Sequence, residues 1–257
     1  MTGPWMEVVS AGMGGLLFGS FLNVCALRWP QDASVVAPRS RCPGCGATVA
    51  WYDNVPVVSW LLLRGACRAC DQGISIQYPV VELAVGLLWA GMAFQHGFSI
   101  EAIRGGLFLT ILLGIALSDA RFYIIPDQFS LGGAVLGLAL APFAPAIAFV
   151  EALTGAVVGF VLLWVVGWLG RKAFKKEAMG GGDIKMMAMV GAFLGTQGVF
   201  LTVFLGSLVG TIVFGPISYR TGRLVPFGIF LAAGAAVTYA WGDPLVGWYL
   251  DWALGAS

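Results

Sequence analysis

The chain of 257 residues is 59% hydrophobic and only 11% charged, with a formal net charge of +1 and a mean hydropathy of +0.87. A water-soluble domain of this size needs far more charge on its surface, so the composition excludes an ordinary soluble protein. Several apolar stretches are long enough to cross a bilayer core about 30 Å thick, which takes about 20 helical residues. The sequence therefore predicts an all-α polytopic membrane protein.

Hydropathy and helix breakers predict about eight transmembrane helices. They are expected near residues 7–27, 78–96, 105–119, 128–143, 147–169, 184–195, 198–218 and 226–242. The sixth of these is short and rich in glycine, which is compatible with a tilted or partly inserted helix. We expect three parts along the chain: a first transmembrane helix over 1–27, a loop domain over 28–77, and a polytopic domain over 78–257.

The basic residues predict how the chain is oriented in the membrane. In an eight-span arrangement, every lysine and arginine except Arg104 falls in connections on one side. Short loops rich in lysine and arginine stay in the cytoplasm. This side is therefore expected to be cytoplasmic, with the loop domain on it and both termini on the other side.

The loop domain carries two closely spaced pairs of cysteines. Cys42-Pro-Gly-Cys45 and Cys67-Arg-Ala-Cys70 are separated by 21 residues. Two such knuckles supply the four thiolates that a structural Zn²⁺ prefers, whereas structural disulfides are disfavoured in a reducing cytoplasm. The sequence therefore predicts a four-cysteine zinc site that ties the loop together. A redox dithiol pair and cysteines without a shared role are the alternatives.

Three aspartates lie where predicted spans begin or end. Asp119 ends the third span, Asp127 precedes the fourth, and Asp183 begins the sixth after a run of glycines. In the orientation above, all three reach the cytoplasmic boundary of the membrane. Asp119 and Asp127 are rivals for the same role on this evidence.

A pair of carboxylates at such a boundary predicts hydrolytic chemistry. Two neighbouring acids in a partly dry site cannot both ionise at low cost, so the site holds one acid and one base. The base can activate water while the acid polarises a peptide carbonyl and assists the leaving amine. Gly180, Gly181 and Gly182 would let a substrate backbone approach, because no Cβ blocks it. Alternatively, Asp119 and Asp183 are helix-end charges, with Asp183 as an N-cap.

Six stretches, in this order, resemble the type IV prepilin leader peptidases. They are "FGSFLNVCALRWP", "WYDNVPVVSWLLLRGACRAC", "ISIQYPVVEL", "DARFYIIPD", "GGGDIKMMAMVGAFLG" and "PFGIFLAAGA". The resemblance runs through most of the chain and extends to the wider class of GxGD-type aspartic proteases. It implies that Asp119 and Asp183 are the catalytic acids and that Asp127 is a structural residue at the start of a helix.

The resemblance also implies a substrate and a second activity. Members remove a short basic leader from prepilins and pseudopilins, cutting after a glycine at the cytoplasmic face of the bacterial inner membrane. Forms with the long four-cysteine loop also methylate the new N-terminal amine with S-adenosylmethionine, and this chain keeps that loop. Glu82 is a candidate for the methyl-transfer site, because an acid inside a span usually has a function or a partner. A Glu82 neutralised by a neighbouring helix is an equal alternative.

Membrane lipid is the expected surrounding, and no nucleic-acid partner is expected. Two other classes of protein compete with the peptidase hypothesis. A proton-coupled transporter would place acids near the bilayer midplane and show two related halves, whereas these acids lie at one boundary and no repeat is evident. A membrane thiol oxidoreductase would use the paired cysteines, but on the oxidising side of the membrane.

Overall fold

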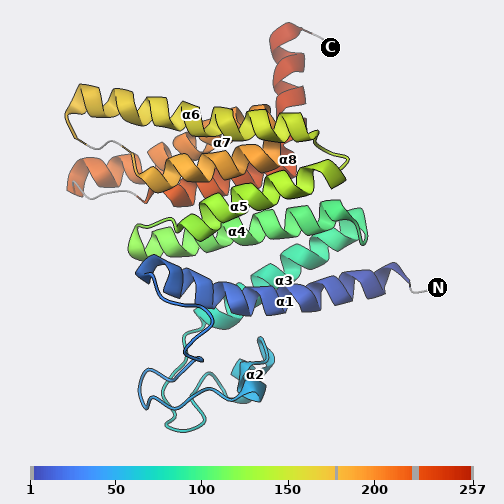
Figure 1. Cartoon of the computed structure of the whole chain (residues 1–257), viewed down its shortest axis with the longest axis vertical. Helices are drawn as coiled ribbons and strands as arrows, with labels where there is room; N and C mark the ends of the chain where they lie inside the picture. The colour runs from blue at the N-terminus through green and yellow to red at the C-terminus, as the bar shows by residue number, and fades with distance from the viewer. Residues whose placement is uncertain (1–2, 177–178, 222–225, 256–257) are drawn as a thin grey trace. The chain divides into compact units, whose positions relative to one another are not determined.

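The computed structural model describes residues 3–176, 179–221 and 226–255, and its regular elements there are all helical. Figure 1 shows the helices in chain order, with the N-terminal ones in blue and the C-terminal ones in red. They are α1 (Pro4–Arg28), α2 (Val58–Leu62), α3 (Gln77–His96), α4 (Ile100–Phe122), α5 (Asp127–Leu140), α6 (Phe149–Phe174), α7 (Gly181–Thr221) and α8 (Phe227–Leu254). The predicted all-α fold class is confirmed.

Six helices in the described part of the chain are long and apolar enough to cross a membrane: α1, α3, α4, α6, α7 and α8. About eight spans were expected, and the difference has two causes. The expected span 128–143 is the 14-residue helix α5, which is only about 21 Å long at 1.5 Å per residue. The expected spans 184–195 and 198–218 both lie within α7.

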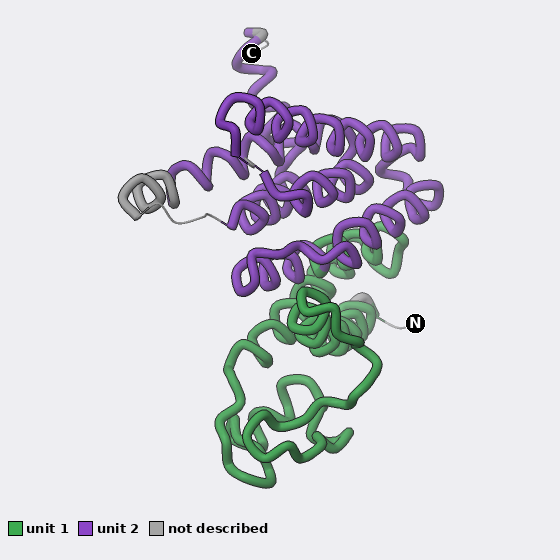
Figure 2. Tube along the Cα trace, turned by 60° about the vertical axis from the view of Figure 1, so that its left-hand side comes forward, with its two compact units in different colours: residues 1–110 green, residues 111–257 purple. Residues whose placement is uncertain are grey.

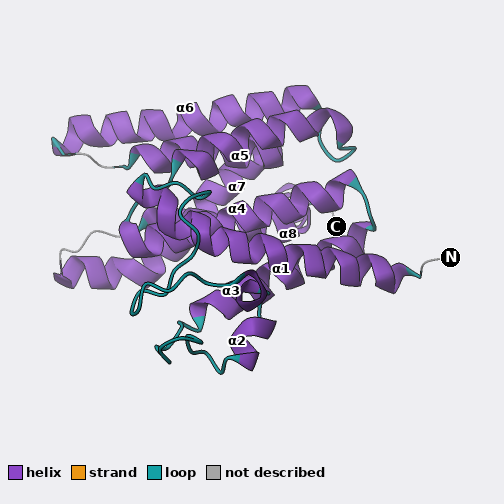
Figure 3. Cartoon of the chain, turned by 60° about the horizontal axis from the view of Figure 1, so that its bottom comes forward, coloured by secondary structure: helices purple, strands orange, loops and turns teal. Residues whose placement is uncertain are grey.

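Helix α7 is interrupted at Gly195, whose backbone angles (φ 68°, ψ −173°) are not helical. The first arm of α7 begins at Gly182 beside Ile125, and α8 begins at Gly228 beside the same isoleucine. The second arm runs antiparallel to α8, because Gly206 follows Thr202 and both approach Gly234. The chain therefore turns back at Gly195, and the two ends of α7 lie on the same side in Figures 1 and 3.

Glycines allow α6 and the first arm of α7 to pack backbone against backbone. A Cβ on Gly191 would overlap the carbonyl group of Gly155, and one on Gly159 would overlap the carbonyl oxygen of Met187. Small residues permit this close approach between membrane helices, where the gain is van der Waals contact rather than the hydrophobic effect. Helix α5 covers the same arm, with Gly133 against the buried Met189.

The chain divides into two compact units, residues 1–110 and 111–257, which Figure 2 shows in different colours. In the first unit, α1 packs against α3, again through glycines: a Cβ on Gly15 would lie 2.9 Å from the Cα of Gly86. The loop domain belongs to this unit. The second unit runs from the second half of α4 to the end of the chain and contains all three aspartates of interest.

We expect Gly191→Ala to destabilise the protein, because the new methyl group has no room against the backbone of α6. Overpacking of this kind costs about 1–3 kcal/mol. The matched control is Gly132→Ala in α5, where nothing lies within 4 Å of the added Cβ. Alanine there should be neutral or stabilising, since it favours a helix over glycine by about 1 kcal/mol. Thermal unfolding in detergent measures both, and equal midpoints would contradict the packing argument.

Candidate functional site

Asp119 lies near the end of α4, and its carboxylate reaches the first turn of α8. The side chain is only 5% exposed. The backbone N–H of Ile229 donates to Asp119 Oδ2 at 3.1 Å, and the N–H of Gly228 also interacts with it. The first N–H groups of a helix have no partner within that helix, and Pro226 at the N-cap offers no side-chain hydrogen bond. Asp119 therefore caps α8 from a different helix.

Asp183 lies in the first turn of α7 and is 9% exposed. Its carboxyl group accepts a hydrogen bond from the backbone N–H of Gly180 and interacts electrostatically with Asp119. Asp183 Oδ1 is buried and has no hydrogen-bond partner among the described residues. The structure thus brings together the two acids, which are separated by 64 positions in the sequence (183 − 119). One of their four oxygens is left free to bind something else.

Ile125 lies between the starts of the two acid-bearing segments. A Cβ on Gly182 would come within 2.9 Å of Ile125 Cβ, and one on Gly228 would come within 2.7 Å of Ile125 Cδ1 and 2.9 Å of Asp119 Oδ2. The turn before α5 therefore fits against both helix starts only because these two positions are glycines. Sequence reasoning missed Gly228, although the Pro-Phe-Gly sequence at a helix start was a visible signal.

The three glycines before Asp183 have different surroundings. Gly182 packs against Ile125, so its missing side chain makes room for the protein itself. A Cβ on Gly181 would meet nothing within 4 Å, and one on Gly180 would lie 3.1 Å from Asp183 Oδ2. Of the three positions expected to admit a substrate, only Gly181 faces open space.

Asp127, the rival of Asp119 in the sequence, has a different environment. It begins α5, and its side chain is 55% exposed. Lys185 Nζ donates to both of its carboxylate oxygens, at 2.7 and 2.9 Å. Asp127 thus forms a surface ion pair that joins α5 to α7, whereas Asp119 is buried beside Asp183. This arrangement agrees with the structural role that the resemblance implies for Asp127.

The four cysteines of the loop domain converge on one point. Their Sγ atoms all lie within 4.8 Å of one another, and Cys42 Sγ is 3.7 Å from Cys70 Sγ. Tetrahedral Zn²⁺ with Zn–S bonds of about 2.3 Å requires sulfur atoms about 3.8 Å apart, so the cluster is compatible with zinc. Backbone N–H groups of Cys45 and Gly44 lower the pKa of the Cys42 thiol to about 6. Cys42 is therefore a thiolate at neutral pH, the form that binds metal.

The two cysteine pairs adopt the same turn. The N–H of Cys42 donates to the carbonyl of Ala47 at 2.9 Å, and the N–H of Cys67 donates to that of Gln72 at 2.8 Å. The residue that follows the second cysteine is left-handed in both, with φ 71° at Gly46 and 55° at Asp71. The spacing of the cysteines predicted the cluster but not this repetition.

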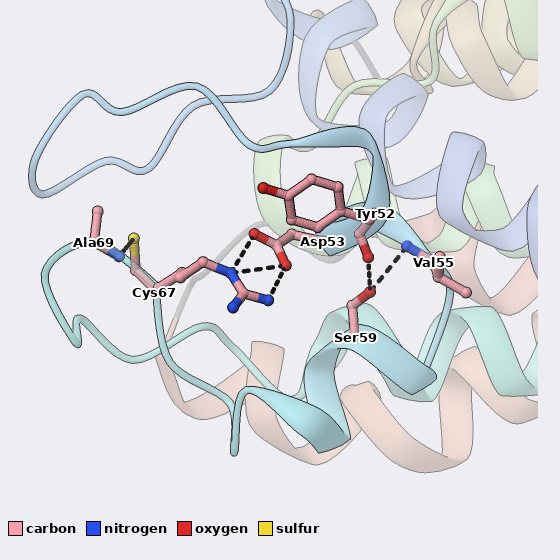
Figure 4. Close-up of polar contacts among 7 residues, drawn as sticks. Tyr52, Asp53, Val55, Ser59, Cys67 and Ala69 are labelled. Atoms are coloured by element: carbon pink, nitrogen blue, oxygen red, sulfur yellow. Dashed lines mark hydrogen bonds and ion pairs between the residues drawn. The ribbon is translucent and has the colours of Figure 1, made fainter.

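The second knuckle is tied to the 3-10 helix η2 (Trp51–Asn54) by an ion pair. Arg68, between the two cysteines of that knuckle, donates from Nη2 to Asp53 Oδ1 at 2.6 Å and from Nε to Oδ2 at 2.9 Å. The hydrogen bonds and charge of Arg68 hold the pKa of Asp53 below its usual value. Figure 4 shows Asp53 beside Tyr52, and the hydroxyl of Ser59 that bonds the Tyr52 carbonyl and the Val55 N–H.

Glu82 has a partner within the protein. This residue of α3 is 7% exposed, and its Oε2 accepts a hydrogen bond of 2.7 Å from the backbone N–H of Val57. Val57 has φ 62° and ψ −50°, a conformation that a β-branched residue rarely adopts. Glu82 thus fastens a strained turn of the loop domain to α3. This contact corresponds to the structural alternative for Glu82.

Comparisons with known proteins cover almost the whole chain. A family model described as "Bacterial Peptidase A24 N-terminal domain" matches residues 13–96, and one described as "Type IV leader peptidase family" matches residues 106–215. No solved structure matches.

Three curated relatives carry the same name, prepilin leader peptidase/N-methyltransferase. The relative from Stutzerimonas stutzeri is 38% identical over 278 residues, which cover 97% of this chain and 96% of that protein. The relative from Bacillus subtilis (strain 168) is 32% identical over 246 residues, covering 94% of this chain and 97% of that protein. The relative from Myxococcus xanthus (strain DK1622) is 41% identical over 212 residues, which cover 82% of this chain but 63% of that longer protein.

Proposed function

Because the chain belongs to the type IV leader peptidase family, which confirms the resemblance in its sequence, we propose that it is an aspartic endopeptidase of the bacterial inner membrane. Its substrates are type IV prepilins or pseudopilins, which it cuts after a glycine at the cytoplasmic face to remove a short basic leader. It then methylates the new N-terminal amine. The observation that carries the peptidase half is the burial of Asp119 and Asp183 side by side at helix ends.

The two acids divide the work of hydrolysis between them. One carboxylate removes a proton from a water molecule, whose oxygen attacks the carbonyl carbon of the scissile peptide bond. The other acid is protonated, donates a hydrogen bond to the carbonyl oxygen and later gives its proton to the leaving amine. Both groups must lie in one partly dry site for this chemistry, which is the arrangement of Asp119 and Asp183.

The surroundings of the two carboxyl groups favour one assignment of these roles. Asp119 faces the N–H groups at the start of α8, whose partial positive charge stabilises a carboxylate. Asp183 faces Asp119 and has one oxygen without a donor. The shared proton therefore resides on Asp183. Asp119 is the base, and Asp183 is the acid whose free oxygen can meet the substrate carbonyl.

The loop domain binds one structural Zn²⁺ in this proposal. Cys42, Cys45, Cys67 and Cys70 would hold it, and the metal would close the two knuckles into a single unit. The ion pair between Arg68 and Asp53 then links that unit to η2. The convergence of four thiols on one point supports a metal site rather than a redox dithiol pair.

The other two classes of protein gain no support. The acids at issue occupy the end of α4 and the start of α7 rather than the middle of a span, as a transporter would require. A thiol oxidoreductase would use an exposed, reactive cysteine pair, and here the four sulfurs form one cluster. The relatives named above are peptidases with methyltransferase activity by name.

Asp119→Asn and Asp183→Asn should each lower the rate of prepilin cleavage at least about a hundredfold, because each removes a proton-transfer group. Asp127→Asn should retain cleavage, since it breaks only an exposed ion pair with Lys185. Conversion of a purified prepilin in detergent, followed by gel shift, measures all three. An inactive Asp127→Asn beside an active Asp119→Asn would reverse the assignment of the first acid.

Gly228→Ala should also impair cleavage, although it leaves both acids in place. The added methyl group would lie 2.9 Å from Asp119 Oδ2 and must displace the carboxyl group from the N–H of Ile229. The matched control is Gly247→Ala in the same helix, where nothing lies within 4 Å. Equal cleavage by the two variants at equal thermal stability would show that α8 does not position Asp119.

Freshly purified protein should contain one zinc per chain, measured by elemental mass spectrometry. Cys42→Ser and Cys67→Ser should each lose that metal, because a three-thiolate site binds it more weakly. Cys25→Ala is the control: this cysteine is buried in α1 and is not part of the cluster, so the variant should keep the metal. Wild-type protein without metal would refute the zinc assignment.

A further inference from the structure

A second site lies in the first compact unit, away from both the aspartates and the cysteine cluster. A cavity of about 260 Å³ opens between the end of α1, the segment after it and η2. Small-molecule sites usually begin at about 300 Å³, so a partly exposed ligand of modest size fits here. Neither the peptidase chemistry nor the zinc site uses this groove.

The charge of the groove selects the chemistry of its ligand. Arg28 and Arg39 line it, and no acidic residue does. Arg28 is already committed to the wall, because its guanidinium donates to the carbonyls of Ser34 and Pro38 at 2.8 Å each. Arg39 is exposed at the rim and can bind a carboxylate through two hydrogen bonds. A basic leader peptide would be repelled from this surface.

The opposite wall offers an aromatic ring and an amide. Trp51 lines the groove, is 75% exposed and is steadied by an edge contact with Tyr52 at 5.6 Å between ring centroids. An exposed indole can stack on a planar base and attracts a cation to its face. Asn54 lines the same wall and can donate to and accept from the edge of such a base.

We propose that this groove is the binding site for S-adenosylmethionine, with Arg39 on its carboxylate, Trp51 on its adenine ring and sulfonium end, and Asn54 on the edge of the adenine. The proposal rests on the methyltransferase half of the proposed function. The donor supplies a methyl group on a sulfonium sulfur. The free substrate amine attacks that carbon, so a C–N bond forms as the C–S bond breaks. The electron pair goes to the sulfur, and water accepts the proton from the nitrogen.

An anionic phospholipid headgroup shares the preference for arginines. Trp51 and Asn54 favour the methyl donor, because a phosphodiester headgroup has no planar base to stack or to hydrogen-bond. The groove and the two aspartates belong to different compact units of the chain. The proposal therefore requires that donor binding can be lost while peptide cleavage is kept.

The test is calorimetric titration of S-adenosylmethionine into zinc-loaded full-length protein in nanodiscs of neutral lipid. Trp51→Ala and Arg39→Gln should each weaken binding about tenfold or more, since stacked aromatic and arginine contacts dominate such sites. Trp51→Phe keeps a stacking ring and should stay closer to wild type. The matched control for charge is Arg64→Gln, which removes an exposed arginine of the loop domain that does not line the groove and should bind like wild type.

Three further measurements interpret the titration. Zinc content shows that the loop domain of each variant is folded. Cleavage of prepilin by Trp51→Ala and Arg39→Gln should match wild type, while transfer of labelled methyl falls with donor binding. Unchanged donor binding in both variants would overturn the proposal, as would its abolition by phosphatidylglycerol in the nanodisc, which would make the groove a lipid site. Wild-type protein that cleaves but binds no donor also overturns it, whereas loss of cleavage alone counts against the peptidase function.

Discussion

Backbone N–H groups at the start of α8 hold the carboxylate of Asp119, and the arrangement of the second unit depends on this contact. A buried acid requires donors, and the first turn of a helix requires acceptors, so each satisfies the other. The contact places α8 against the end of α4, while Ile125 fills the space between the starts of α7 and α8. Asp183 then reaches Asp119 from the first turn of α7. The geometry of the two acids is therefore a product of three helix ends meeting around one side chain.

Much of this protein could be predicted from residue types and spacing. The all-α membrane fold follows from composition, and the cysteine cluster follows from two Cys-x-x-Cys pairs, because a thiolate tetrahedron has few other sequence signatures. The family resemblance separated Asp119 from Asp127, and their contrasting burial agrees with that separation. These features are local or carried by chemistry that few other patterns share.

Other features could not be predicted because they depend on contacts between distant segments. The role of Gly228 requires knowledge that α8 begins beside Asp119, more than 100 positions earlier in the chain. The turn at Gly195 reads as an ordinary glycine in an apolar run until its positive φ is known. Gly182 was expected to make room for a substrate, but its neighbour is Ile125. In each case a glycine identifies a close approach without saying what approaches.

The reversal at Gly195 has a consequence for the surrounding lipid. The first arm of α7 ends after about 14 residues, and α5, which packs against it, is equally short. Each is about 21 Å long, well below the hydrocarbon thickness of about 30 Å. A bilayer accommodates such hydrophobic mismatch by thinning locally. The membrane beside Asp183 is therefore expected to be compressed, which shortens the path of water to an acid at its edge and leaves the substrate helix less lipid to hold it straight.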